Sequence, residues 1–134
     1  MGDRMAGDAV ERTVAIVGDD PETRDSVATL LEVHGFGVSQ YESIEAFLAD
    51  RAAVALAHCL VLDVSRSEVN GLDPLDRLAR RRPSANDTFP PAILISTNAT
   101  PPVAARARAA GVHIVLDRPV PPLELLAYVR ALAD

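Results

Sequence analysis

The sequence predicts a doubly wound α/β domain, in which a five-stranded parallel sheet carries helices on both faces. Short apolar runs alternate with segments in which apolar residues recur at helical spacing. The first, third, fourth and fifth runs are continuously apolar, as expected of parallel strands buried on both faces, whereas the second mixes polar and apolar residues. An edge position for the mixed run, with right-handed crossovers, favours the strand order 2-1-3-4-5.

The composition suits one domain with an aliphatic core. Of 134 residues, 49% are hydrophobic and only 4% aromatic, so Val, Leu, Ile and Ala must fill the interior. The formal net charge of −6 argues against nucleic-acid binding as the main function, because such domains are usually basic. Cys59 is the only cysteine, which excludes a disulfide framework. No membrane span or signal region is visible, so we expect a cytoplasmic protein without membrane contact.

The strands and their boundaries follow from the apolar runs and the turn residues. Residues 1–12 lack periodicity and predict a flexible N-terminal arm, which leaves 13–134 as the domain. The predicted strands are residues 14–17, 38–41, 59–62, 92–95 and 112–116. Asp63 stands directly at the end of the third strand.

The helices between these strands are predicted from spacing and from end signals. Ser43 and Thr100 are expected N-caps, and Gly35 and Gly111 stand where helices should stop. The apolar residues that define the helix faces are Val27, Leu30 and Leu31; Ile44, Phe47 and Leu48; Leu72, Leu75 and Leu78; and Leu123, Leu126, Val129 and Leu132.

Charged and hydroxyl residues follow four of the predicted strands: Asp19 and Asp20 the first, Asp63 the third, Ser96 the fourth and Arg118 the fifth. In the predicted strand order these ends meet, and gathered carboxylates favour a hard cation such as Mg²⁺. A hydroxyl and a cation opposite them would suit a phosphoryl group, with Asp63 as the nucleophile. Each residue alone also fits an ordinary turn or cap, so the residues by themselves leave both interpretations open.

The order of the motifs carries a resemblance over residues 13–132. They read VAIVGDDPETR at 14–24, CLVLDV at 59–64, NGL at 70–72, ILIS at 93–96, AAG at 109–111 and RP at 118–119. The chain thus resembles the receiver domain of two-component response regulators. Ser26, HGF at 34–36, YES at 41–43 and FL at 47–48 make it most similar to the nitrogen-fixation type, whose receivers usually precede a LuxR-like DNA-binding domain. The resemblance implies the flavodoxin-like fold described above.

The resemblance also implies roles for individual residues. Asp63 is expected to be the phosphoacceptor and, with Asp19 and the backbone carbonyl of Ser65, to bind Mg²⁺. Ser96 and Arg118 are expected to contact the phosphoryl group.

Three positions depart from the family pattern. Gly18 stands where the first acidic residue is expected, and Asp20 is the candidate that would replace it in part. Arg118 takes the place of the usual lysine, so charge is kept but a planar fork replaces a point charge. Val115 takes the place of the aromatic switch residue. We therefore expect Mg²⁺ to bind weakly.

The leading hypothesis is a receiver, not an enzyme, that accepts a phosphoryl group on Asp63 from a histidine kinase or phosphotransfer protein. It would signal through the fourth helix, the fifth strand and the last helix, where Arg106 and Arg108 are candidate contacts for a homodimer or an output domain. Nucleic acid would be reached only through an output domain that is not part of this chain.

Two alternatives come from other classes. The first is a degenerate pseudo-receiver that acts as a phosphorylation-independent interaction or dimerisation module, favoured by Gly18, Val115 and Arg118. It predicts an Arg118–Asp63 contact at rest. The second, a small phosphatase or flavin-binding protein, is disfavoured because the loop at 18–21 is acidic and would repel phosphate.

Overall fold

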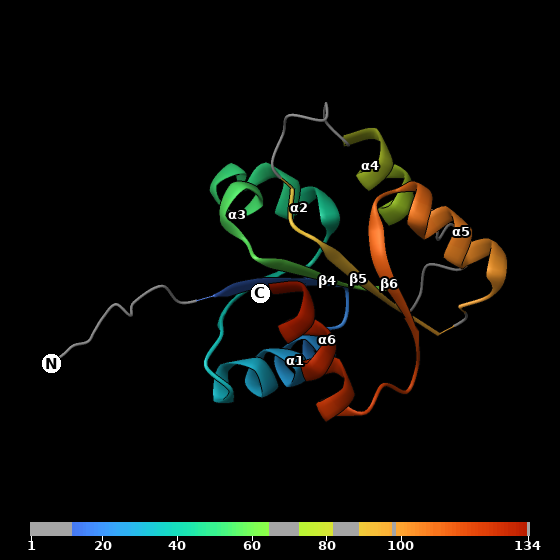
Figure 1. The fold of residues 1–134 in the computed structure, drawn as a ribbon. Coiled ribbons are helices and arrows are strands. Elements are labelled where there is room, and N and C mark those ends of the chain that lie inside the picture. The colour runs from blue at the N-terminus through green and yellow to red at the C-terminus, as the bar shows by residue number, and fades with distance from the viewer. Residues whose placement is uncertain (1–11, 65–72, 82–88, 98, 134) are drawn as a thin grey trace, which may run out of the picture.

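The computed structural model describes residues 12–64, 73–81, 89–97 and 99–133, and within them one parallel sheet (Figure 1). Its strands run in the order β3-β2-β4-β5-β6, which in chain order is the predicted 2-1-3-4-5 arrangement. The prediction of the strand order is therefore confirmed. The strands are β2 (Thr13–Gly18), β3 (Gly37–Tyr41), β4 (Cys59–Val64), β5 (Ala92–Ser96) and β6 (Val112–Asp117).

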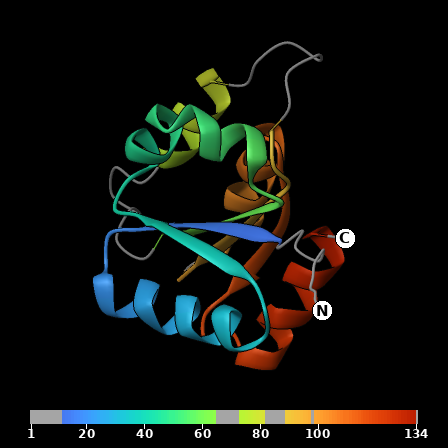
Figure 2. The same ribbon diagram turned by 90° about the vertical axis from the view of Figure 1, so that its left-hand side faces the viewer.

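Helices cover both faces of this sheet, as the sequence predicts (Figures 1 and 2). One face carries α1 (Pro21–Val33) and α6 (Pro122–Ala133). The other carries α2 (Ile44–Ala49), α3 (Arg51–Leu56), α4 (Asp73–Arg81) and α5 (Pro101–Ala109). In the described part of the chain, no helix is long and apolar enough to cross a membrane.

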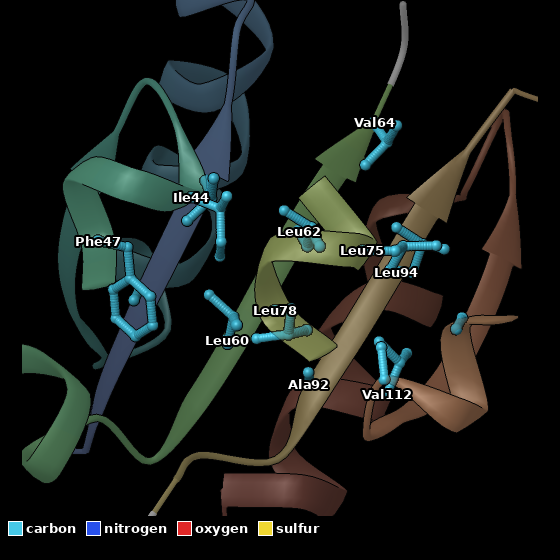
Figure 3. Packing of buried hydrophobic residues seen from close by; sticks show 14 of the residues in the cluster. Ile44, Phe47, Leu60, Leu62, Val64, Leu75, Leu78, Ala92, Leu94 and Val112 are labelled. Atoms are coloured by element: carbon cyan, nitrogen blue, oxygen red, sulfur yellow. The ribbon is translucent and has the colours of Figure 1, made fainter. Parts of the chain in front are cut away.

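The central strands have unbroken apolar sequences because their side chains pack into two hydrophobic cores, one on each face of the sheet. In β4, Leu60 and Leu62 pack beneath α2 to α5, while Val61 faces α1 and α6. Figure 3 shows Leu75 and Leu78 of α4 lying over the former face. Since successive strand residues point to opposite sides, a strand covered on both faces has no place for a polar residue until it ends.

The two edge strands differ from the central ones. Ser39 and Gln40 of β3 are exposed, as predicted for an edge. The expectation that the fifth strand is buried on both faces is wrong, because only Val112 and Leu116 of β6 are buried and His113 is exposed. The strand order itself gives the reason: β6 is the last strand of the sheet, so its cover is incomplete.

The predicted helix end signals are present. The Ser43 hydroxyl accepts a hydrogen bond from the Ala46 amide (3.1 Å), and the Thr100 hydroxyl accepts one from the Val103 amide (3.4 Å). Gly35 and Gly111 adopt φ values of 94° and 98°, the left-handed region that favours glycine after a helix.

A helix break at Asp50 is a feature that the sequence analysis missed. The Asp50 carboxylate accepts hydrogen bonds from the Ala53 amide (3.1 Å) and from the Tyr41 hydroxyl (2.8 Å). It thereby caps α3 and separates it from α2. The tyrosine comes from the end of β3, so this boundary depends on a tertiary contact as well as on the local sequence.

Candidate functional site

The carboxyl ends of the central strands bring the predicted site residues together. In the sheet register Gly18 of β2 lies opposite Asp63 of β4, and Val64 of β4 lies opposite Ser96 of β5. Ser96 in turn lies opposite Asp117, the residue before Arg118. Because all strands are parallel, these ends share one edge of the sheet, where the strand order reverses direction between β2 and β4.

Asp63 is a buried carboxylate with a cation as its partner. Only 7% of the residue is exposed. The Nη2 atom of Arg118 donates a hydrogen bond to Asp63 Oδ1, and the two side chains form an ion pair. A buried charge is costly without such a partner, so this contact is what makes an ionised Asp63 tolerable at this position. The pair places the Asp63 carboxylate and the positive charge of Arg118 in direct contact.

Backbone contacts hold Arg118 at the site. Its amide donates to the Ser96 carbonyl (3.0 Å), which ties the residue after β6 to the end of β5, and the Arg118–Pro119 peptide bond is cis. Arg118 Nε is buried and has no hydrogen-bond partner among the described residues. The guanidinium therefore contacts Asp63 through one arm and retains a donor for a further acceptor.

Ser96 completes the buried side of the site. It is the last residue of β5 and is 6% exposed, and with Asp63 it makes up the buried polar residues of the described chain. The interior of the sheet is otherwise aliphatic, so two buried polar residues near the ends of adjacent strands make this edge the candidate site for a polar ligand.

The acidic turn after β2 is exposed. Asp19 and Asp20 both lie at the surface, and Asp20 precedes the first turn of α1. Asp20 Oδ2 accepts a hydrogen bond from the Thr23 hydroxyl (2.5 Å), which is the main reason that the pKa of Asp20 is lowered, and the Arg118 charge adds to the effect. Asp20 thus serves the start of the helix, whereas replacement of the missing carboxylate stays a prediction.

Gly18 contributes no carboxylate to the site, where the resemblance predicts an acidic residue. A Cβ atom built on Gly18 would lie 3.3 Å from Asp63 Cβ and 3.5 Å from the Asp63 carbonyl oxygen. A side chain at position 18 would therefore border Asp63 directly. The Gly18 carbonyl instead accepts a hydrogen bond from the Arg24 guanidinium.

Arg24 is a cation beside the site that the sequence analysis did not single out. Its Nε donates to Gln40 Oε1 (3.3 Å), and Gln40 Nε2 donates to Asp25 Oδ1 (3.1 Å). The signal that was available is its spacing: Arg24 lies one helical turn after Asp20, and its amide donates to the Asp20 carbonyl (3.0 Å). A residue one helical turn after Asp20 lies near the end of β2, because α1 begins three residues after that strand ends.

Val115 is partly buried and packs against the core beneath α2 to α5. Ser65 lies outside the described residues. Burial raises the pKa of the Cys59 thiol to about 12, which makes this thiol unsuited to nucleophilic chemistry near neutral pH.

The donor set for a metal is thin. In the described ranges no group of three or more His, Cys, Asp or Glu residues is arranged to hold an ion. Asp19 directly follows β2, Asp63 is the last residue but one of the neighbouring strand β4, and one oxygen of Asp63 already accepts a hydrogen bond from Arg118. Oxygen donors of this kind suit Mg²⁺, so the residues fit a weak site with less negative charge than the resemblance implies.

Comparison with known proteins decides the family. The model of the response regulator receiver domain matches residues 14–130. The chain belongs to this family. Receivers of the family take part in two-component signalling, and the flavodoxin-like strand order agrees with that membership.

Curated receivers of known regulators are similar over most of the chain. The transcriptional regulatory protein FixJ of Azorhizobium caulinodans is 31% identical over 118 residues, covering 88% of this chain and 53% of FixJ. The response regulator protein TmoT of Ectopseudomonas mendocina is 32% identical over 120 residues, covering 90% of this chain and 52% of TmoT. The chain therefore spans about half the length of these regulators.

Solved structures show the same fold. The chemotaxis protein CheY4 of Vibrio cholerae superposes with a TM-score of 0.74 at 21% identity, covering 92% of this chain and 99% of that protein. The BeF₃-activated DrrB receiver domain gives a TM-score of 0.70 at 25% identity and covers 92% of this chain and 97% of that domain.

Proposed function

We propose that this receiver accepts a phosphoryl group on Asp63 from a histidine kinase or phosphotransfer protein. The observation that carries the proposal is the buried Asp63 carboxylate, in contact with Arg118 and next to the buried Ser96 at one edge of the sheet. A carboxylate nucleophile, a fixed cation and a hydroxyl are the groups that phosphoryl transfer to an acid requires. The proposed domain covers residues 13–134, and its kinase partnership implies a cytoplasmic location.

In the proposed reaction an Asp63 oxygen attacks the phosphorus of a phosphohistidine. The new P–O bond forms as the P–N bond breaks, and the imidazole departs with the electron pair and takes up a proton. Asp63 thereby becomes an acyl phosphate. The unpartnered Arg118 Nε supports this role, because a phosphoryl group would bring the additional acceptors that the single Asp63 contact does not supply.

The other residues of the site would assist without reacting. The Ser96 hydroxyl would donate to a phosphoryl oxygen, and Asp19, Asp63 and the Ser65 carbonyl would hold a magnesium ion. When bound, that ion supplies positive charge to the phosphoryl oxygens. With only two carboxylates in its donor set, we expect binding to be weak.

The signal would leave through α5, β6 and α6. Arg108 is exposed and Arg106 partly exposed on α5, and Leu123 of α6 is 69% exposed. Exposed apolar and arginine side chains are typical of contact surfaces, so this face would meet a second copy or an output domain. The matches cover only about half of FixJ and TmoT, which are named as regulators, and DNA binding would belong to such an added part.

A second function is favoured by a specific observation, the resting Arg118–Asp63 pair. In a pseudo-receiver this pair would hold the site closed, and the protein would act as an interaction module without phosphate. Gly18 supports it, because the position that borders Asp63 carries no carboxylate. Val115 supports it too, since no aromatic ring is available there to move on activation.

The two functions are distinguished by intact mass after incubation with acetyl phosphate and Mg²⁺. The receiver hypothesis predicts a gain of one phosphoryl group in the parent and none in Asp63→Asn. If the parent gains none, while Gly18→Asp with Arg118→Lys gains one, the pseudo-receiver is the better account. Light scattering with and without the phosphodonor then tests whether the oligomeric state follows phosphorylation.

A further inference from the structure

The positive charge of Arg118 lies where a metal would otherwise act. Asp63 is 7% exposed, so its carboxylate has little water to stabilise its charge. In the resting structure that stabilisation comes from the guanidinium on Oδ1. Any divalent cation that binds Asp63 must share this carboxylate with an arginine or displace it.

The local charge adds to this competition. The carboxylates Asp19, Asp20 and Asp63 contribute −3, and the guanidinium groups of Arg118 and Arg24 contribute +2, so the net charge of these five groups is −1. Arg118 donates to Asp63 and Arg24 to the Gly18 carbonyl. Gly18 adds no carboxylate, although its Cβ position lies 3.3 Å from Asp63 Cβ. A dication therefore meets a site in which two arginines offset most of the negative charge that would attract it.

The arginine contact is also incomplete. One arm of Arg118 reaches Asp63, while the buried Nε has no partner in the described part of the chain. A contact that leaves a buried donor unsatisfied is easier to exchange than a fully paired one. Arg118 is thus placed to leave Asp63 when a ligand with more acceptors arrives.

We infer that Arg118 is the resident counter-cation of Asp63 and competes with divalent cations for its carboxylate. The inference rests on the proposed site but not on phosphoryl transfer. The receiver rests in a metal-poor state because its own guanidinium neutralises the acceptor. Loss of the arginine should expose the carboxylate to metal, at a cost in stability.

Manganese titration tests the competition without a phosphodonor. Mn²⁺ takes the same oxygen ligands as Mg²⁺, and its free concentration is read directly by electron paramagnetic resonance. The variants are Arg118→Gln, which keeps hydrogen-bonding groups but removes the charge, and Arg118→Ala, which removes both. The matched control is Arg108→Gln, an exposed arginine on α5 whose loss changes net charge equally.

Both Arg118 variants should bind Mn²⁺ about tenfold more tightly than the parent, and Arg108→Gln should change the dissociation constant by less than about twofold. Adding Asp63→Asn to Arg118→Gln should abolish the gain. An unchanged affinity in Arg118→Gln would overturn the inference, as would a gain that survives Asp63→Asn. Should Arg118→Ala not fold, the milder Arg118→Gln alone decides.

The outcome is independent of the proposed function. If the Mn²⁺ results are as expected but no phosphodonor modifies the protein, the competition between Arg118 and the metal is supported and the proposed phosphoryl transfer to Asp63 is contradicted. If the protein is phosphorylated on Asp63 and Arg118→Gln gains no affinity, the reverse holds.

Discussion

The two sides of the site differ in burial. On the β4–β5–β6 side, Asp63 and Ser96 are buried, and Arg118 is tied to the sheet by its backbone. On the β2–α1 side, Asp19 and Asp20 are exposed and Gly18 carries no side chain. The buried side holds the groups proposed to contact a phosphoryl group, and the exposed side contributes Asp19, which would hold a metal together with Asp63. Departures from the family pattern lie on both sides, with Gly18 on the exposed side and Arg118 on the buried side, so the clearest difference between the sides is their exposure.

Removing the cation from the buried side should have the largest effect on stability. Arg118→Ala leaves Asp63 buried and unpaired, so we expect the free energy of unfolding to fall by about 3 kcal/mol in urea denaturation. Adding Asp63→Ala should recover part of this loss, because the uncompensated charge disappears. An Arg118→Ala protein as stable as the parent would mean that the ion pair does not stabilise the buried Asp63 carboxylate. The proposed difference between the buried and exposed sides would then lose its main energetic support.

Removing the hydroxyl from the buried side should have an intermediate effect. Ser96→Ala removes a buried polar group that has an interaction partner, so we expect a loss of about 1 kcal/mol in the same denaturation assay. Ser96→Thr, which keeps the hydroxyl, serves as the control. Equal stability of the Ala and Thr variants would show that the hydroxyl contributes nothing in the unphosphorylated state.

A change on the exposed side should have the smallest effect. The Thr23 hydroxyl lowers the pKa of Asp20, so this contact stabilises the fold above the ordinary pKa of an aspartate and ceases to do so as pH falls through the lowered value. Thr23→Val should return the pKa of Asp20 toward its ordinary value, measured by carboxyl ¹³C NMR between pH 2 and pH 6. An unchanged titration would show that Thr23 does not hold Asp20 in solution.

The fold could be predicted because its signals are local and repeated. Strands buried on both faces are apolar throughout, so β2, β4 and β5 could be recognised from their residues alone. Ser43 and Thr100 act within one helical turn, which a sequence displays directly. The incomplete burial of β6 follows from its place at the edge of the sheet, which the apolar residues of the strand do not reveal by themselves.

The site could be predicted only as a set of positions. Register brings Asp63, Ser96 and Arg118 together once the strand order is known. The Arg24–Gly18 and Thr23–Asp20 hydrogen bonds depend on the directions of side chains at the start of α1. The strand order does not determine these directions. At the break, the Asp50 carboxylate accepts a local hydrogen bond from the Ala53 amide and a second one from the hydroxyl of Tyr41, which lies nine residues away on another element.

The identity of the phosphorylated residue is the most direct test of the account. Borohydride reduces an acyl phosphate on aspartate to homoserine, which tandem mass spectrometry locates in the digested protein. After treatment with a phosphodonor, we predict homoserine at position 63 and unmodified aspartate at positions 19 and 20. Unmodified Asp63 in the treated parent, or homoserine at Asp19 or Asp20 in its place, would contradict the assignment of Asp63 as the phosphoacceptor.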